Sequence, residues 1–88
     1  MTYYDRIKKA KAYIKNCNRV GWPDTEDGIS KLCEEMGEME QKIFRIGRFV
    51  RNWRGWVFQM PSTNLILDAV ENNRELRKDI LFVTDEEG

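Results

Sequence analysis

The apolar residues at the start of the chain follow a helical spacing. They recur at steps of three and four residues, at Tyr3, Ile7, Ala10, Ile14 and Cys17. Such steps place side chains on one face of a helix. Thr2 suits the N-cap position and Asp5 the first helical turn. Gly21 and Pro23 follow Asn18 and end helices. We therefore predict a first helix from residue 2 to about residue 18.

The strongest periodic signal lies in the middle of the chain. After a cap at Asp24 or Thr25, an alternating three–four spacing joins Ile29, Leu32, Met36, Met39, Ile43, Ile46, Val50 and Trp53. Heptads of this kind predict one long helix, from residue 25 to about residue 53 and at most to residue 58. Gly37 and Gly47 lie inside it, and each would cost about 1 kcal/mol relative to alanine.

Residues 54–61 interrupt the helical pattern, and we interpret them as an aromatic connection with room for a short extended piece. Ser62 or Thr63 can cap a third helix, whose apolar face continues to Val83. We expect residues 83–88 to form a frayed tail. The chain of 88 residues is predicted to be one domain, residues 1–88. The expected fold is all-α, a three-helix bundle with a long central helix.

The length of the central helix predicts self-association. The first helix is too short to cover it, so the apolar residues between Ile43 and Trp53 would need a second chain. Small domains also often gain stability from subunit contacts. We therefore expect a helical homo-oligomer, a dimer or a tetramer.

Composition excludes some classes of function. Fifteen basic residues balance fifteen acidic ones, which argues against a generic polyanion binder but permits a local basic patch. The sequence contains no histidine, which excludes histidine-based catalysis and histidine-ligated zinc. Cys17 and Cys33 are expected to be small buried residues in a reducing compartment. Without a long apolar run or a signal peptide, we expect a cytoplasmic protein.

Two acidic groups are candidates for chemistry. Glu35 and Glu38 are three residues apart and would share one flank of the long helix. Glu75 and Asp79 would lie on the third helix. If the helices pack, four like charges would repel unless a divalent cation such as Mg²⁺ neutralised them. Water on that metal can attack a phosphoryl centre. The alternative is that these carboxylates are solvated surface charges.

A sequence motif favours the first interpretation. A Gly21–Asp24 turn (Gly-Trp-Pro-Asp) is followed by Lys31–Met39, which reads K-L-C-E-E-M-G-E-M. Over residues 20–44 this resembles the MazG-like all-α nucleoside triphosphate pyrophosphohydrolases. The resemblance implies Mg²⁺-dependent hydrolysis of a (d)NTP to NMP and pyrophosphate, in a dimer or tetramer. It also implies that Glu35 and Glu38 are catalytic metal ligands.

The second half of the chain departs from that family. The family has an ExxD motif on the next helix, whereas Glu75 and Asp79 are four residues apart. The three helices predicted here also leave out the fourth helix of that family. Nucleotide binding without cleavage therefore remains an alternative.

A row of arginines with aromatic neighbours forms a third candidate. Arg45, Arg48, Arg51 and Arg54 recur every three residues, with Trp53 and Trp56 among them. Guanidinium groups and aromatic rings bind phosphates and bases, but they are also common in protein interfaces. The second hypothesis is therefore a non-catalytic binder, a phage-type inhibitor of a host protein or a nucleotide-sequestering protein, acting through residues 45–58. Its candidate contacts are Arg48, Arg51, Trp53, Arg54 and Trp56, with nucleic acid as a less favoured ligand.

Overall fold

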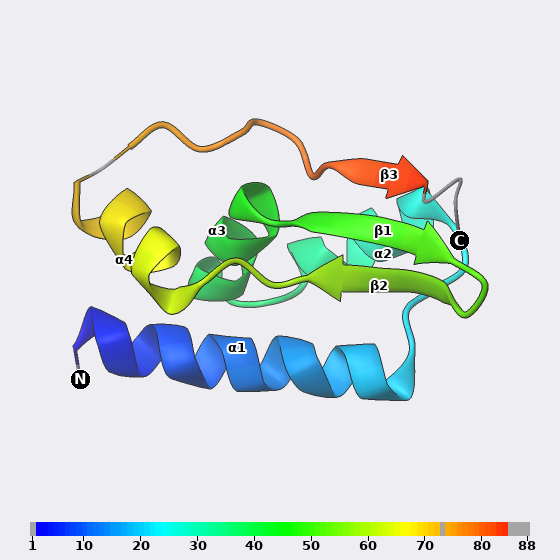
Figure 1. The fold of residues 1–88 in the computed structure, drawn as a ribbon, viewed down its shortest axis with the longest axis horizontal. Coiled ribbons are helices and arrows are strands. Elements are labelled where there is room, and N and C mark those ends of the chain that lie inside the picture. Colours follow the sequence, from blue (N-terminus) through cyan, green and yellow to red (C-terminus); the bar gives the residue numbers. More distant parts are fainter. Residues whose placement is uncertain (1, 73, 85–88) are drawn as a thin grey trace.

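The computed structural model describes residues 2–72 and 74–84 and shows helices packed with a small sheet (Figure 1). The elements are α1 (Tyr3–Val20), α2 (Glu26–Glu34), α3 (Glu38–Ile46), β1 (Arg48–Asn52), β2 (Gly55–Gln59), α4 (Thr63–Glu71) and β3 (Phe82–Thr84). The strands lie in the order β2-β1-β3. β1 pairs with β2 antiparallel and with β3 parallel. The fold is therefore α+β, and the prediction of an all-α bundle was wrong.

The first helix forms as its residue pattern predicts. Thr2 caps it, because its Oγ1 accepts a hydrogen bond of 3.2 Å from the backbone N–H of Asp5. Ile7 and Ile14 are fully buried on its inner face. The helix ends at Val20, two residues later than predicted. Gly21 follows with φ +109°, a conformation that glycine adopts readily.

The predicted long helix is interrupted first at residues 35–37. The side-chain Nε2 of Gln41 donates to the backbone oxygens of Glu34 at 3.2 Å and of Met36 at 2.9 Å. The last carbonyls of a helix have no partner within the helix, so this amide stabilises the end of α2. Gly37 then takes an extended conformation as the N-cap of α3, which begins at Glu38.

The second interruption is at Gly47, where the chain leaves α3 and enters β1. A Cβ atom here would lie 2.5 Å from Cζ of Phe58 and 2.6 Å from the backbone oxygen of Gln59. Only glycine allows β2 to pass so close. The C-terminal segment is also fixed at this point, because the guanidinium of Arg77 donates to the backbone oxygen of Gly47.

Most of the apolar residues that were expected to need a second chain are packed inside this one, with Trp53 as the exception. Ile43, Phe44 and Phe49 are fully buried. The ring of Phe49 lies 5.8 Å from that of Phe44 and 5.0 Å from that of Phe58, measured between ring centroids. Burial of these rings within one chain removes the argument for self-association, so the homo-oligomer stays a prediction without structural support.

The third predicted helix is shorter than expected. Ser62 caps α4, because its Oγ accepts a hydrogen bond of 3.2 Å from the backbone N–H of Leu65. The helix ends at Glu71, and the chain returns in an irregular segment to β3 (Figure 1). Val83 and Thr84 pair with β1 and are not part of a frayed tail. Residues 85–88 lie outside the described part of the chain.

Within residues 2–72 and 74–84, no helix is both long enough and apolar enough to cross a lipid bilayer.

Candidate nucleic-acid interface

The structure does not bring the four candidate carboxylates into one cluster. Glu35 caps the end of α2 and Glu38 begins α3. The carboxylate of Glu38 is 74% exposed and pairs with Nζ of Lys42 at 3.3 Å. Glu75 and Asp79 lie in the irregular segment after α4. Among the described residues, no group of three or more acidic or cysteine side chains can hold a metal ion. The Mg²⁺ ion stays a prediction.

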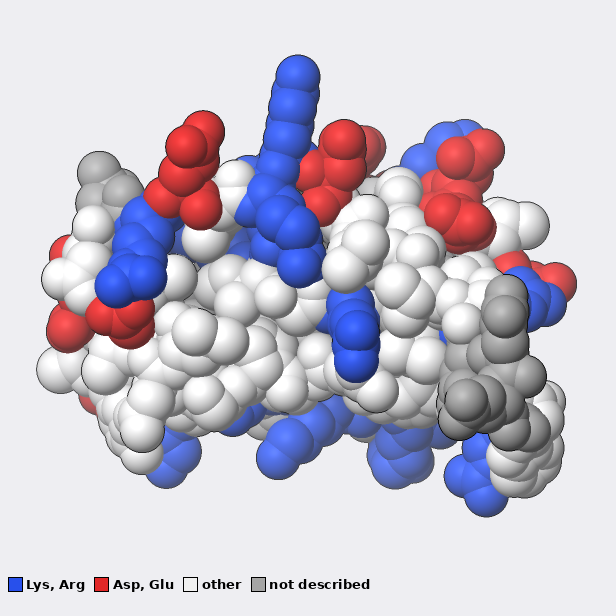
Figure 2. All heavy atoms as spheres, turned by 45° about the horizontal axis from the view of Figure 1, so that its top comes forward, with Lys and Arg blue, Asp and Glu red and all other residues white. Residues whose placement is uncertain are grey.

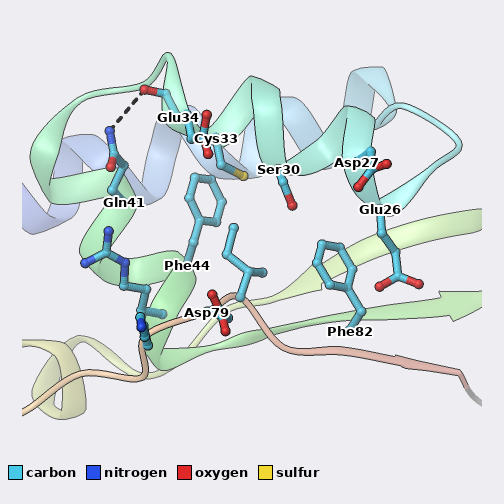
Figure 3. Close-up of a pocket in the computed structure, with 12 residues that line it drawn as sticks. Glu26, Asp27, Ser30, Cys33, Glu34, Gln41, Phe44, Asp79 and Phe82 are labelled. Atoms are coloured by element: carbon cyan, nitrogen blue, oxygen red, sulfur yellow. Dashed lines mark hydrogen bonds between the residues drawn. The ribbon is translucent and has the colours of Figure 1, made fainter.

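Asp79 instead lies at a cavity of about 380 Å³ between α2, α3 and residues 78–82. Figure 3 shows Glu26 and Glu34 at opposite ends of the α2 side of this cavity, away from Asp79. Arg45 and Lys78 also line it, so both signs of charge are present. The thiol of Cys33 lines the cavity as well, and burial raises its pKa to about 12, with smaller contributions from Cys17 and Glu34.

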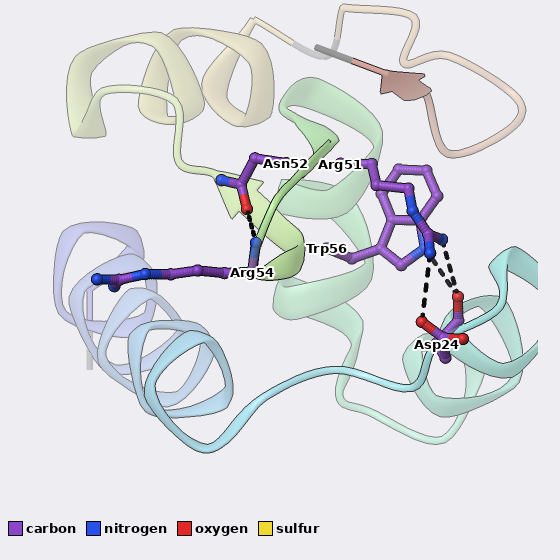
Figure 4. A network of polar contacts seen from close by, with 5 residues as sticks. All are labelled: Asp24, Arg51, Asn52, Arg54 and Trp56. Atoms are coloured by element: carbon purple, nitrogen blue, oxygen red, sulfur yellow. Dashed lines mark hydrogen bonds and ion pairs between the residues drawn. The ribbon is translucent and has the colours of Figure 1, made fainter. Parts of the chain in front are cut away.

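Two of the predicted contact residues have structural roles. The guanidinium of Arg51 lies 3.5 Å from the carboxylate of Asp24 and donates to the Asp24 backbone oxygen at 3.3 Å. Trp56 is 9% exposed, and its indole N–H donates to the same backbone oxygen at 3.0 Å. Figure 4 shows both side chains converging on Asp24. They hold the loop before α2 against the hairpin, and their role as ligand contacts stays a prediction.

Arg48 is exposed but engaged within the sheet. Its Nε donates to Oε1 of Gln59 at 2.7 Å, across the β1–β2 pair. This contact fixes the side chain along the outside of the hairpin.

Trp53 and Arg54 form the tip of the β1–β2 hairpin, where they are open to solvent. Trp53 is 80% exposed. The guanidinium Cζ of Arg54 lies 4.6 Å from the centre of the Trp53 ring, a cation–π distance. The turn is held by Oδ1 of Asn52, which accepts a hydrogen bond of 2.8 Å from the backbone N–H of Arg54. Gly55 supplies a φ of +104°. A short, fixed turn thus presents an aromatic ring and a cation together.

The sequence-based choice of site residues missed the main cationic element, which is α1. It carries six basic residues, Arg6, Lys8, Lys9, Lys11, Lys15 and Arg19, and one acidic residue, Asp5. At about 100° per residue, Lys8, Lys15 and Arg19 share one line within roughly 40°. The ion pairs found within residues 2–72 and 74–84 involve none of these six.

The C-terminal end of the basic line of α1 lies near the hairpin tip. Asn18 hydrogen-bonds to Phe58 of β2 through its side chain, so the side of α1 next to the basic line faces the hairpin. Arg54 lies at the C-terminal end of α1, where it lines a cavity of about 320 Å³ together with Asn18 and Gly21. In Figure 2, Lys and Arg side chains follow the lower edge of the molecule, where α1 lies in Figure 1.

Charge is separated between two sides of the fold. α1 and residues 48–59 together contain nine basic residues and one acidic residue. Residues 24–40, which form α2 and the start of α3, contain seven acidic residues and one basic residue. The net charge of zero is therefore the sum of a basic part, α1 with residues 48–59, and an acidic remainder. The sequence signal that could have identified this basic surface is the excess of lysine and arginine over carboxylates in the first helix.

Comparisons with protein-family models, with curated proteins and with solved structures give no match to this chain. The resemblance to the MazG-like family is thus neither supported nor refuted, and it stays an interpretation of residues 20–44.

Proposed function

We propose that this protein binds nucleic acid through a surface formed by α1 and the hairpin tip. We call it the α1–hairpin surface and define it by Lys8, Lys15, Arg19, Trp53 and Arg54. The observation that carries the proposal is the line of Lys8, Lys15 and Arg19 on α1, with Arg54 at the C-terminal end of the same helix; these side chains take part in none of the ion pairs found within residues 2–72 and 74–84. Cationic side chains gathered on one surface bind the phosphate backbone and release its counterions. This is the local basic patch that a balanced composition permits.

A different docking mode is less favoured by the same charges. α2, the turn 35–37, α3 and the β1–β2 hairpin follow one another as in helix-turn-helix proteins with a β-wing, which place the second helix in the major groove. Here α3 begins with Glu38 and Glu40, which would repel phosphates. Lys78 and Asp79 of the C-terminal segment also line a cavity against α3. We therefore assign the ligand to α1 and the hairpin tip.

The test is a titration of fluorescently labelled duplex and single-stranded oligonucleotides, followed by anisotropy at several salt concentrations. We expect binding that weakens steeply between about 50 and 200 mM salt. The variant Lys8→Gln/Lys15→Gln/Arg19→Gln should bind at least about tenfold more weakly. Its slope of log K against log salt should be flatter by about two units for a single strand and nearly three for a duplex, because three phosphate contacts are lost.

A matched control variant distinguishes binding by a defined surface from binding that depends only on the net charge of the protein. The variant Lys31→Gln/Arg45→Gln/Lys78→Gln also removes three exposed cations, from α2, α3 and the C-terminal segment. It should bind almost as well as the parent. Equal loss in both triple variants would mean that no defined surface exists. Absence of binding to every oligonucleotide at low salt would reject the proposal.

Mg²⁺-dependent hydrolysis of a nucleotide remains a separate prediction from the sequence. It is checked by pyrophosphate release from a panel of (d)NTPs with Mg²⁺ or Mn²⁺. Turnover that disappears in Glu38→Gln and survives the α1 variant would support it and would place the chemistry away from the α1–hairpin surface.

A further inference from the structure

The hairpin tip differs from the rest of the α1–hairpin surface because it presents an aromatic ring. The chain has three tryptophans, and two of them are fixed within the fold. The indole N–H of Trp22 donates to Oδ1 of Asn18 at 2.7 Å, and that of Trp56 donates to the backbone oxygen of Asp24 at 3.0 Å. Trp53 is 80% exposed. Within residues 2–72 and 74–84 it joins none of the aromatic pairs of the core.

The tip is held in one conformation, so the ring is presented without a large loss of backbone freedom on binding. The strands pair through all five of their residues, from Arg48 opposite Gln59 to Asn52 opposite Gly55. The Asn52–Arg54 hydrogen bond of 2.8 Å closes the turn between them. Preorganisation of this kind favours binding, because less ordering is required when the ligand arrives.

The neighbours of Trp53 indicate the chemistry of its ligand. The guanidinium of Arg54 lies 4.6 Å from the centre of the ring. Arg54 lies at the C-terminal end of α1, the helix that carries the other cations of this surface. Residues 48–59 carry no carboxylate. An apolar pocket on a protein would have to desolvate these cations, which is unfavourable without paired acids. A nucleobase stacks on the ring while its phosphates remain beside the cations, so both groups are satisfied.

We infer that Trp53 is a stacking platform for an unpaired nucleobase, with Arg54 and the α1 cations holding the adjacent phosphates. This inference rests on the proposed function and extends it to a ligand class, single-stranded nucleic acid or a strand with unstacked bases. In an intact duplex the bases are stacked on one another, so a ring at the end of a two-residue turn reaches them only if a base is displaced.

The test uses an oligothymidylate of about a dozen nucleotides and an abasic strand of the same length, within the range of single-strand binding sites. The abasic strand keeps the phosphates and lacks the bases. We expect the parent protein to bind the oligothymidylate about tenfold more tightly than the abasic strand. Trp53→Ala should remove that difference. Trp53→Phe, which retains a ring, should keep most of it.

A spectroscopic readout reports on stacking itself. Tryptophan emission of the parent protein should be quenched when the oligothymidylate binds, and this quenching should be absent in Trp53→Phe, which retains Trp22 and Trp56. Leu65→Ala is the control, since Leu65 is an exposed apolar residue, 52% accessible, on α4 at the other end of the molecule (Figure 1). It should behave as the parent does.

The two proposals fail in different ways. Salt-dependent binding that is the same for both strands and unchanged in Trp53→Ala would overturn stacking and leave nucleic-acid binding in place. Equal affinity for a perfect duplex and for the oligothymidylate would also overturn it. If neither strand binds at low salt but a duplex does, stacking is overturned alone; if no strand and no duplex binds, both proposals fall.

Discussion

The side chain of Asn18 satisfies both backbone groups of Phe58. Its Nδ2 donates to the Phe58 oxygen and its Oδ1 accepts from the Phe58 N–H, each at 3.0 Å. β2 is an edge strand, and unpaired edges are sites of unwanted association. One asparagine of α1 therefore acts as a short piece of neighbouring strand, and it fixes the position of the basic helix relative to the hairpin.

Replacing this asparagine tests its role in stability. Asn18→Ala leaves the N–H and C=O of Phe58 without their partners in a part-buried position. We expect a loss of about 1–3 kcal/mol in the free energy of unfolding, measured by urea denaturation. Asn16→Ala, at an exposed position on the same helix, should change stability by less than about 0.5 kcal/mol. Equal unfolding midpoints for the two variants would contradict this assignment.

Gly47 provides a test of the junction between α3 and β1. In Gly47→Ala the new Cβ would meet Cζ of Phe58 at 2.5 Å and the backbone oxygen of Gln59 at 2.6 Å. Backbone cannot yield easily, so we expect destabilisation of about 2–4 kcal/mol. Gly37→Ala is the matched control, because its closest contact is the flexible carboxylate of Glu40 at 2.7 Å. It should cost much less, and similar losses at both positions would be inconsistent with this packing.

The amide of Gln41 is expected to stabilise the turn at residues 35–37. Gln41→Leu removes the hydrogen bonds to the backbone oxygens of Glu34 and Met36 and should lower stability by about 1 kcal/mol. Gln41→Glu should lower it further, because a carboxylate faces the same two carbonyl oxygens. Thermal unfolding followed by circular dichroism gives both values. A glutamate variant as stable as the parent would contradict the predicted role of this amide.

The thiol of Cys33 should make the free energy of unfolding depend on pH, and the direction of its pKa shift determines the sign of that dependence. Burial raises that pKa from 9.0 to about 12, with smaller contributions from Cys17 and Glu34. Above pH 9.0 the unfolded thiol loses its proton while the folded one keeps it. Stability from this group is therefore complete below pH 9.0 and falls as the pH rises toward 12.

The measurement compares urea midpoints of the parent and of Cys33→Val across this range. The valine variant should lose less stability with rising pH. Identical pH profiles would show that the thiol is not protected in the folded state.

Local signals in the sequence predicted the starts of α1, α2 and α4, but not that of α3. Thr2, Thr25 and Ser62 each cap a helix, and each accepts a backbone hydrogen bond from three residues ahead. These interactions span one turn, so short patterns determine them. The buried positions Ile29, Met39 and Ile43 were also part of the predicted apolar face. These residues are buried in the observed pair α2 and α3, as they would be in the single long helix that was predicted, so their burial does not distinguish the two.

The errors arose where distant contacts decide the structure. Gly47 breaks the helix because of Phe58, which lies eleven residues further on. Residues 54–61 were expected to leave room for a short extended piece, and β2 (Gly55–Gln59) lies within them. β1 (Arg48–Asn52) was missed, because the helical spacing of the apolar residues runs through Val50. The pairing of Phe82 with Phe49 joins residues far apart in sequence, and no local pattern predicts it. The predicted metal site required Glu75 and Asp79 to lie on the third helix. That helix ends at Glu71, so both residues lie in the irregular segment that leads to β3.

The separation of charge has a consequence for how the molecule meets its ligand. The uneven distribution of charge between α1 and residues 24–40 would turn the protein toward a polyanion during approach, before any contact forms. In the proposed complex the carboxylates of residues 24–40 would repel a second polyanion, which disfavours the bridging of two strands. Molecules arriving along one strand would all present the same outward, negative face to the solvent, which favours coating of that strand over its condensation.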